Sequence, residues 1–335
     1  MSPRHAGRDI PPPRPLFQFG QRYLSGFAVM PETRAKYEAG CDSFNAWARL
    51  HGLQYDTVIE LDEHLADYVN YMWCEDPSSG SFQRAGHAVY GAPFRAPQIR
   101  DHLPAAHLAL RGWSRTLTQH SPPPISLEVA TAIAVDLWEH GCHDAAIMVL
   151  LSHECYLRAR EAIRLLVGDF GDASHMGLSA ERGVGGIGLR HTKTGPNQFV
   201  SIRDPLVLSL LSRHCDGRPS TVPLFALSYS QYRRQFNDSL RRVGLDGFDF
   251  VLHSLRHGGA TSDFCRNRPY DYIQLRGRWA HSESMVRYIN AGAALSIRLR
   301  YSALTTRCIL AAQLHTHAWF GFREDPRQGH TLYVG

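Results

Sequence analysis

Residues 253–261 read His-Ser-Leu-Arg-His-Gly-Gly-Ala-Thr and place an imidazole and a guanidinium three residues apart. Three other strings in the second half of the chain carry related chemistry: Tyr-Leu-Arg-Ala-Arg-Glu at 156–161, Thr-Lys-Thr-Gly at 192–195 and Gly-Arg-Trp at 277–279. Tyr288 follows the tryptophan of the last string by nine residues. Each string alone is a weak signal, and the order of all of them is informative.

These strings supply one set of candidate catalytic residues: Arg158, Lys193, His253, Arg256, Trp279 and Tyr288. Guanidinium, ammonium, imidazole and indole N–H groups all donate hydrogen bonds, and a guanidinium matches two oxygens of a phosphate at once. A tyrosine hydroxyl can act as a nucleophile that forms a covalent intermediate. The set suits attack on a phosphodiester, whose non-bridging oxygens gain charge in the transition state.

The strings resemble the sequence boxes of the tyrosine recombinases (phage integrase family), from about residue 31 to about residue 300. The first box is matched by Leu157, Arg158, Glu161, Leu165 and Asp169. The second box is matched by His253, Leu255, Arg256, His257, Ala260 and Thr261. The third box usually carries Gly-His, and this chain has Trp279 instead, with Tyr288 at the usual distance. The string Gly-Arg-Trp followed by Tyr288-Ile289 is more similar to recombinases of eukaryotic mobile elements than to the phage enzymes.

The resemblance implies a role for each charged member of the set. Arg158 and Arg256 bind the non-bridging phosphate oxygens, although surface arginines are common in a chain with 34 of them. His253 exchanges a proton near neutral pH. Lys193 protonates the leaving 5′ oxygen after neighbouring guanidiniums lower its pKa. Lys193 is one of only two lysines in the chain, and its ordinary alternative is a surface lysine on a hairpin turn.

The same resemblance implies roles for the aromatic and supporting residues. Trp279 donates its indole N–H to the phosphate, which is compatible with simple core packing. Tyr288 attacks phosphorus and holds the DNA 3′ end, and its alternative is a core tyrosine. Glu161 orients the histidine unless it forms only a surface salt bridge. His257 is a phosphate contact or a packing residue.

The resemblance therefore implies a site-specific DNA recombinase or integrase that cuts and rejoins duplex DNA through a 3′-phosphotyrosine intermediate. Such an enzyme needs no cofactor and no metal, and its partner is double-stranded DNA. A homo-tetramer on paired DNA sites is expected, with the segment 291–310 donated to a neighbouring subunit. The alternatives are a type IB topoisomerase-like enzyme, an inactive DNA-binding relic of a mobile element, and a metal-dependent nuclease, which lacks a clustered Asp/Glu set here.

The distribution of charge favours a polyanionic partner. The chain of 335 residues has a formal net charge of +5. Residues 1–150 carry 12 basic and 16 acidic groups, a balance of −4, whereas residues 151–335 carry 24 and 15, a balance of +9. A basic half suits nucleic acid.

Composition also limits the class of protein. With 44% hydrophobic and 20% charged residues the chain is typical of a globular protein. It has no run of 18 apolar residues and no apolar segment near the N-terminus, so neither a membrane span nor secretion is expected. We expect an intracellular protein, nuclear if the host is eukaryotic and otherwise cytoplasmic. The seven cysteines include no Cys-x-x-Cys, and a metal site in the His/Cys-rich stretch 140–155 is the less favoured alternative.

The expected fold class is mainly α with a small antiparallel β-sheet, consisting of a helical core-binding domain and an α+β tyrosine-recombinase catalytic domain. The expected divisions are a loose Pro/Arg-rich tail (1–25), the core-binding DNA clamp (26–118), a linker (119–125), the catalytic domain (126–312) and a C-terminal tail (313–335). Helical spacing predicts a helix from Pro31 to Leu50 and a second helix that Asp62 caps. Strands are expected near 186–191 and 199–202, with Lys193 in the turn between them. Helices are expected near 229–242, 282–290 and 293–312.

Overall fold

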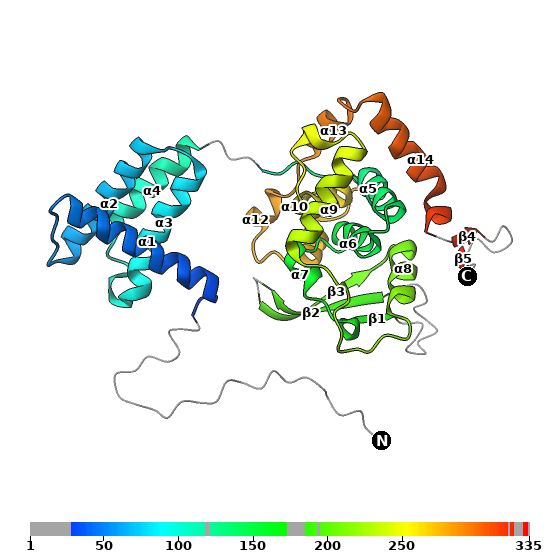
Figure 1. Ribbon diagram of the computed structural model, residues 1–335, viewed down its shortest axis with the longest axis horizontal. Helices are drawn as coiled ribbons and strands as arrows, with labels where there is room; N and C mark the ends of the chain where they lie inside the picture. Colours follow the sequence, from blue (N-terminus) through cyan, green and yellow to red (C-terminus); the bar gives the residue numbers. More distant parts are fainter. Residues whose placement is uncertain are drawn as a thin grey trace, which may run out of the picture. The chain divides into compact units, whose positions relative to one another are not determined.

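The computed structural model describes residues 28–117, 121–172, 185–192, 195–320, 322–324 and 331–333 (Figure 1). The chain divides into two compact units, with the boundary between His120 and Ser121. The fold class predicted from the sequence is confirmed, because helices predominate and the main sheet has three antiparallel strands. No helix of the described residues is long and apolar enough to cross a membrane.

The first unit is helical in its described part. Its elements are α1 (Pro31–Leu50), α2 (Val58–Glu75), α3 (Ser79–Arg95), the 3₁₀ helix η2 (Pro97–Ile99) and α4 (Pro104–Thr116). Helix α1 packs against α3, and α2 packs against α4. Buried apolar side chains such as Phe44, Leu65 and Trp113 form the core between them. This core is separate from that of the second unit.

The predicted N-terminal cap of α2 is wrong. The helix begins one turn earlier than expected, at Val58, and Thr57 caps it by accepting a hydrogen bond from the Glu60 backbone N–H. Asp62 lies within α2, is 5% exposed, and accepts hydrogen bonds from Ala105 N and Ala106 N, both at 2.9 Å. These N–H groups belong to the first turn of α4, where no intrahelical acceptor exists. Asp62 therefore caps α4 from a neighbouring helix.

The second unit contains all the predicted catalytic positions. Its helices are α5 (Leu127–Glu139), α6 (His143–Glu154), α7 (Ala159–Ile163), η3 (Val167–Asp169), α8 (Pro205–Cys215), α9 (Tyr229–Arg242), η5 (Asp246–Phe248), α10 (Leu252–Cys265), α11 (Tyr270–Gly277), α12 (Ser282–Val286), α13 (Ala291–Arg298) and α14 (Ala303–Trp319). Its strands are β1 (Phe170–Asp172), β2 (Gly185–Thr192), β3 (Gly195–Ile202), β4 (Phe322–Glu324) and β5 (Thr331–Tyr333).

Helices α5, α6 and α10 form the centre of this unit (Figure 1). Helix α6 buries every residue from Ala145 to His153, as expected of a helix that is apolar on most of its surface. Helix α10 approaches its neighbours closely because it contains two adjacent glycines. A Cβ on Gly258 would lie 1.8 Å from Ile125 O, and one on Gly259 would lie 2.2 Å from His153 O. The second-box sequence thus fixes α10 directly against α6 and the chain before α5.

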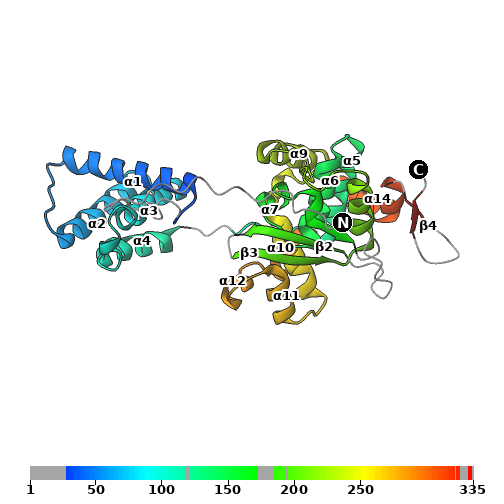
Figure 2. The same cartoon turned by 90° about the horizontal axis from the view of Figure 1, so that it is seen from below.

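The small sheet has the strand order β1-β2-β3, with both pairs antiparallel. Ile187 pairs with Val200, and both side chains are buried in the core of the unit. Strand β2 ends at Thr192 and β3 begins at Gly195, while Lys193 lies outside the described residues. Helix α7 contacts β2, and α11 contacts both α10 and α12 (Figure 2).

The C-terminal part of the unit differs from the single helix expected over 293–312. Two helices, α13 and α14, occupy the stretch, and α14 continues to Trp319. Residues 313–319, expected in a tail, extend α14, which packs against α5. The Phe320 ring is buried and meets Trp138 edge-on at a centroid distance of 5.1 Å. Apolar contact with α5 therefore packs residues that follow position 312, the expected end of the catalytic domain, onto the core of this unit.

Candidate active site

Five of the six predicted catalytic residues lie together at one end of α10. His253, Arg256 and His257 share one face of this helix because they are three and four residues apart. The turn between α6 and α7 contributes Arg158, and the segments after α11 and α12 contribute Trp279 and Tyr288. Lys193, the sixth predicted residue, is outside the part of the chain that the structure describes. The geometry of the site therefore concerns the other five residues.

Arg256 is the most deeply buried charged residue of the site, with no exposed surface. Its Nη1 donates to Tyr156 O, and its Nη2 donates to Gly277 O at 2.6 Å. Its guanidinium lies 4.6 Å from the ring centroid of Trp279 and 5.3 Å from that of Tyr288. The Nε–H is buried and has no partner among the described residues. The Nε nitrogen of Arg256 thus keeps a donor for a ligand.

Two guanidiniums share one carboxylate. Glu161, which is 8% exposed, accepts from Arg158 Nη1 at 2.5 Å and from Arg278 Nη2 at 2.9 Å. Arg158 is the more accessible of the two, since its side chain is 23% exposed and that of Arg278 is 5% exposed. Burial tends to raise the pKa of Glu161, but Arg278 and Arg158 lower it below its ordinary value, so it stays ionised. Its hydrogen bonds therefore position arginines, whereas the resemblance implied that it orients the histidine.

The cluster has an excess of positive charge. Arg158, Arg256 and Arg278 face the single negative charge of Glu161, which leaves a balance of +2. Burial, with the charges of Arg158 and Arg278, lowers the pKa of Arg256. A buried positive cluster of this kind is stabilised by a bound anion.

His253 faces the hydroxyl of Tyr288. Its Nε2 lies 3.3 Å from Tyr288 Oη, and the two ring centroids are 5.4 Å apart. Burial, together with the charges of Arg256 and Arg158, lowers the pKa of His253 to about 4, and Glu161 opposes this only in part. The imidazole is therefore neutral at neutral pH and can accept the tyrosine proton.

His257 packs on the face of Tyr288. The two rings stack at a centroid distance of 4.5 Å, and burial followed by the charges of His253 and Arg256 lowers the pKa of His257 to about 4. Of the two roles predicted for His257, this geometry fits the packing role.

Trp279 combines core packing with a free donor. It is 7% exposed, and its ring lies 4.8 Å from that of Tyr288 by centroids. Its Nε1–H is buried without a partner among the described residues. Buried N–H groups of native proteins nearly always have an acceptor, so an unpaired one at this site indicates room for a ligand acceptor. Gly277 is required beside it, because a Cβ there would lie 1.7 Å from Trp279 Cζ3.

Tyr288 lies in a turn after α12, whereas the sequence pattern predicts a helix through this position. Its N–H donates to Met285 O at 2.8 Å, and its carbonyl oxygen accepts from Thr261 Oγ1 of α10 at 3.2 Å. The neighbouring tyrosines differ in their contacts: Tyr272 Oη accepts from Arg203 Nη1, and Tyr270 is 55% exposed. Tyr288 is the tyrosine whose hydroxyl contacts His253.

Two residues of the site were not identified from the sequence. Arg278 stands in the quoted string Gly-Arg-Trp, and its left-handed backbone (φ +58°) turns its side chain toward Glu161. Tyr156 stands two residues before Arg158 and offers its carbonyl oxygen to Arg256 and Arg278. These contacts join positions 100 or more residues apart, which one sequence does not show.

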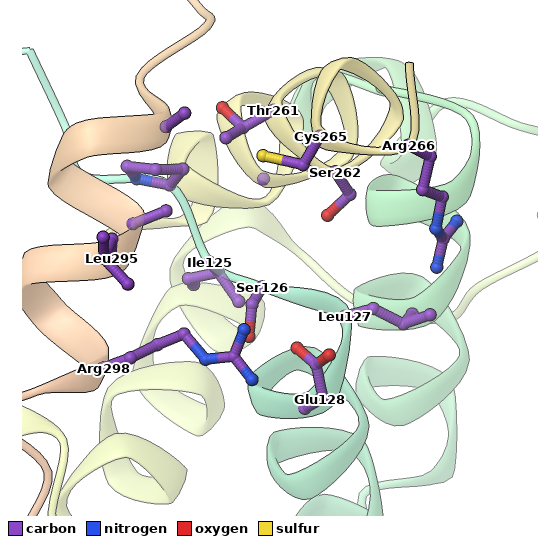
Figure 3. A pocket seen from close by; sticks show the side chains of 14 residues that line it. Ile125, Ser126, Leu127, Glu128, Thr261, Ser262, Cys265, Arg266, Leu295 and Arg298 are labelled. Carbon is purple, nitrogen blue, oxygen red and sulfur yellow. The ribbon is translucent and has the colours of Figure 1, made fainter. Parts of the chain in front are cut away.

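A separate pocket of about 470 Å³ lies between the start of α5, α10 and α13 (Figure 3). Figure 3 shows Arg298 of α13 pointing toward Ser126 and Glu128, with Thr261 and Cys265 on the α10 side. None of the five predicted catalytic residues that the structure describes lines it. Thr261 connects the two regions, because its hydroxyl also contacts Tyr288 O.

The described residues contain no group of three or more His, Cys, Asp or Glu side chains placed to hold a metal ion. The histidine and cysteine side chains of the stretch 140–155 accordingly form no such group. His153 and Cys155 are buried, whereas the His140 side chain is 48% exposed.

No protein-family model matches the chain, and no curated protein matches it by sequence. Among solved structures it is similar to a Tn1549 transposon integrase in complex with transposon right end DNA, with a TM-score of 0.56 and 11% identity, covering 87% of this chain and 97% of that chain. The same integrase with a circular intermediate DNA has a TM-score of 0.55 and 13% identity, covering 83% of this chain and 98% of that one. A lambda integrase dimer bound to a COC′ core site has a TM-score of 0.50 and 14% identity, covering 80% and 74%.

At identities of 11–14% these similarities concern the fold. The chain has the fold of the tyrosine recombinases and integrases, as its sequence boxes led us to expect.

Proposed function

We propose that this protein is a DNA recombinase that cuts and rejoins duplex DNA through a phosphotyrosine intermediate. The observation that carries the proposal is the arrangement around Tyr288. Its hydroxyl is 3.3 Å from His253 Nε2, and two buried N–H donors without partners among the described residues, Arg256 Nε and Trp279 Nε1, lie in the same cluster. A nucleophile, a proton acceptor and unpaired donors for an oxyanion are thus adjacent.

In the proposed reaction, Tyr288 Oη attacks the scissile phosphorus while His253 Nε2 takes the hydroxyl proton. A P–Oη bond forms and the P–O5′ bond breaks. The DNA 3′ end stays on the tyrosine, and the 5′ oxygen leaves with a proton that we assign to Lys193. Arg158, as the more exposed guanidinium, and the unpaired N–H groups stabilise the charge on the non-bridging oxygens. The phosphotyrosine ester retains the energy of the broken phosphodiester bond. Attack on this ester by a 5′ hydroxyl therefore reverses these steps and rejoins the DNA.

The partner in this proposal is double-stranded DNA, and the working unit is a homo-tetramer on paired sites. The solved integrase structures of similar fold are complexes with DNA, which supports the choice of partner. The basic balance of +9 in residues 151–335 supports it independently. In the tetramer we assign the segment 291–310, which includes α13, to exchange between subunits. The proposal that the chain belongs to the branch found in eukaryotic mobile elements rests on the string Gly-Arg-Trp followed by Tyr288-Ile289.

The proposal is tested with nicked duplexes that trap the covalent intermediate. Duplexes that bind the protein are selected from a random pool, nicked near the selected site, and incubated with the protein in EDTA. We expect a protein–DNA adduct that survives denaturing electrophoresis. Binding without any adduct would instead indicate the DNA-binding relic. Relaxation of supercoiled plasmid by a monomer, without strand exchange, would indicate the topoisomerase-like alternative.

A further inference from the structure

Tyr156 adopts a backbone conformation that is unusual for an aromatic residue. Its φ of +48° lies in the left-handed region, where the side chain of an L-residue is strained. The residue is 1% exposed and lies in the turn between α6 and α7, two residues before Arg158. Strained, buried backbone persists only where surrounding contacts hold it. The contacts of Tyr156 therefore indicate what the strain maintains.

One set of contacts runs along a single face of α10. Arg256, Gly259 and Asp263 follow each other at three and four residues, so they lie in a row. The Tyr156 carbonyl oxygen accepts from Arg256 Nη1, and its hydroxyl donates to Asp263 Oδ2 at 2.5 Å. Its ring fits beside Gly259, where a Cβ would come within 2.5 Å of Tyr156 Cδ1. Tyr156 thus spans two turns of the helix that carries His253 and Arg256.

A second set of contacts reaches the third box. The same Tyr156 carbonyl oxygen accepts from Arg278 Nη2 at 3.2 Å, and the Tyr156 ring lies 6.1 Å from that of Trp279 by centroids. The guanidinium of Arg276 lies 5.5 Å from the Tyr156 ring centroid. Burial and the hydrogen bond to Asp263 raise the pKa of Tyr156, so its hydroxyl keeps the proton that it donates. One residue therefore connects the first, second and third boxes.

We propose that Tyr156 is a positioning residue that sets the placement of Arg256 and Trp279 for the proposed strand cleavage. The inference rests on the proposed function. The hydrogen bond from the Tyr156 hydroxyl to Asp263 stabilises the strained turn. The turn places the Tyr156 carbonyl oxygen, which accepts a hydrogen bond from Arg256 and so positions it. Tyr156 itself does not contact the reacting atoms. A small displacement of Arg256 would weaken its unused Nε–H as a donor to the phosphate, because transition-state stabilisation depends closely on geometry.

The test uses Tyr156→Phe, which removes only the hydroxyl oxygen and keeps the ring beside Gly259. Tyr272→Phe is the matched control, because it removes the same atom from a nearby tyrosine whose hydroxyl accepts from Arg203, which is none of the predicted catalytic residues. The first readout is the rate of adduct formation at saturating nicked duplex, measured with the Kd for that duplex. The second is the solvent exchange of the Arg256 Nε–H in protein labelled with ¹⁵N-arginine, assigned by its loss in Arg256→Lys.

We expect Tyr156→Phe to slow adduct formation by about 10- to 100-fold, with Kd changed by less than about twofold. We also expect faster exchange of the Arg256 Nε–H, and wild-type behaviour of Tyr272→Phe in both measurements. A wild-type rate and exchange in Tyr156→Phe would overturn the inference. If the wild-type protein forms no adduct, the proposed function fails. The exchange of the Arg256 Nε–H then decides alone whether Tyr156 positions this arginine.

Discussion

Trp279 has two properties that substitutions can separate. Its ring packs against Arg256 and Tyr288, and its Nε1–H is buried without a partner among the described residues. Trp279→His keeps a ring donor, whereas Trp279→Ala removes both the ring and the donor. In the nicked-duplex assay we expect appreciable activity in the histidine variant and a loss of about 100-fold or more in the alanine variant. Equal rates in the two variants would show that Trp279 only fills space.

His153 provides a test of burial through pH. It is 3% exposed, and burial, followed by the charge of Arg266, lowers its pKa from 6.5 to about 4. Between these values the unfolded chain binds the proton that the folded chain excludes, so stability falls as pH falls from about 6.5 to about 4.

We therefore expect a smaller pH effect in His153→Phe, because phenylalanine cannot titrate. Over that interval its free energy of unfolding should fall by about 1 to 3 kcal/mol less than that of the wild type. Urea unfolding of both proteins at several pH values measures the difference. Parallel pH profiles would mean that His153 titrates normally in the folded protein.

Single residues also show where sequence reasoning reaches its limit. The spacing of Trp279 and Tyr288 predicted a shared site, and their rings are 4.8 Å apart by centroids. The role of Arg278 was not predictable, because its partner Glu161 is 117 positions away and its left-handed backbone turns the side chain inward. The local sequence pattern predicts neither the partner of Arg278 nor its left-handed backbone. The catalytic role of Lys193 stays a prediction.

Among the elements, helices with clear local signals were predicted best. Helix α9 occupies 229–242 as expected, since Ser228 caps it and accepts from Gln231 N. Helix α12 ends at Val286, before Tyr288, because contacts with α10 replace the helical continuation. The capping role of Asp62 toward α4 depends on tertiary packing in the same way. Tertiary contacts thus decided the boundaries that the local pattern missed.

Asp62 offers a prediction at the scale of one element. Asp62→Ala leaves two N–H groups of α4 without their acceptor, so we expect the amides of α4 to exchange faster by about 10- to 100-fold, equivalent to about 1 to 3 kcal/mol. Asp67→Ala is the control, because Asp67 is exposed on the same helix. Hydrogen exchange of the full-length chain measures both. Unchanged α4 protection in Asp62→Ala would contradict the cap.

At the scale of the whole molecule, charge asymmetry determines how DNA binding depends on salt. Residues 151–335 carry a balance of +9, and neutralising phosphates releases counterions. We expect affinity for duplex DNA to fall by about 100-fold or more between 50 and 200 mM salt, measured by fluorescence anisotropy. Affinity that does not change with salt, or no binding to any duplex, would contradict a partner recognised through its phosphates.

The most direct test of the central claim is to locate the covalent bond. The adduct trapped on nicked duplex is digested with protease and nuclease, and the peptide that carries the nucleotide is sequenced by mass spectrometry. The account predicts a phosphodiester on Tyr288, and no adduct from Tyr288→Phe although that variant still binds DNA. A nucleotide on Tyr272 or any other residue, or an undiminished adduct in Tyr288→Phe, would contradict it.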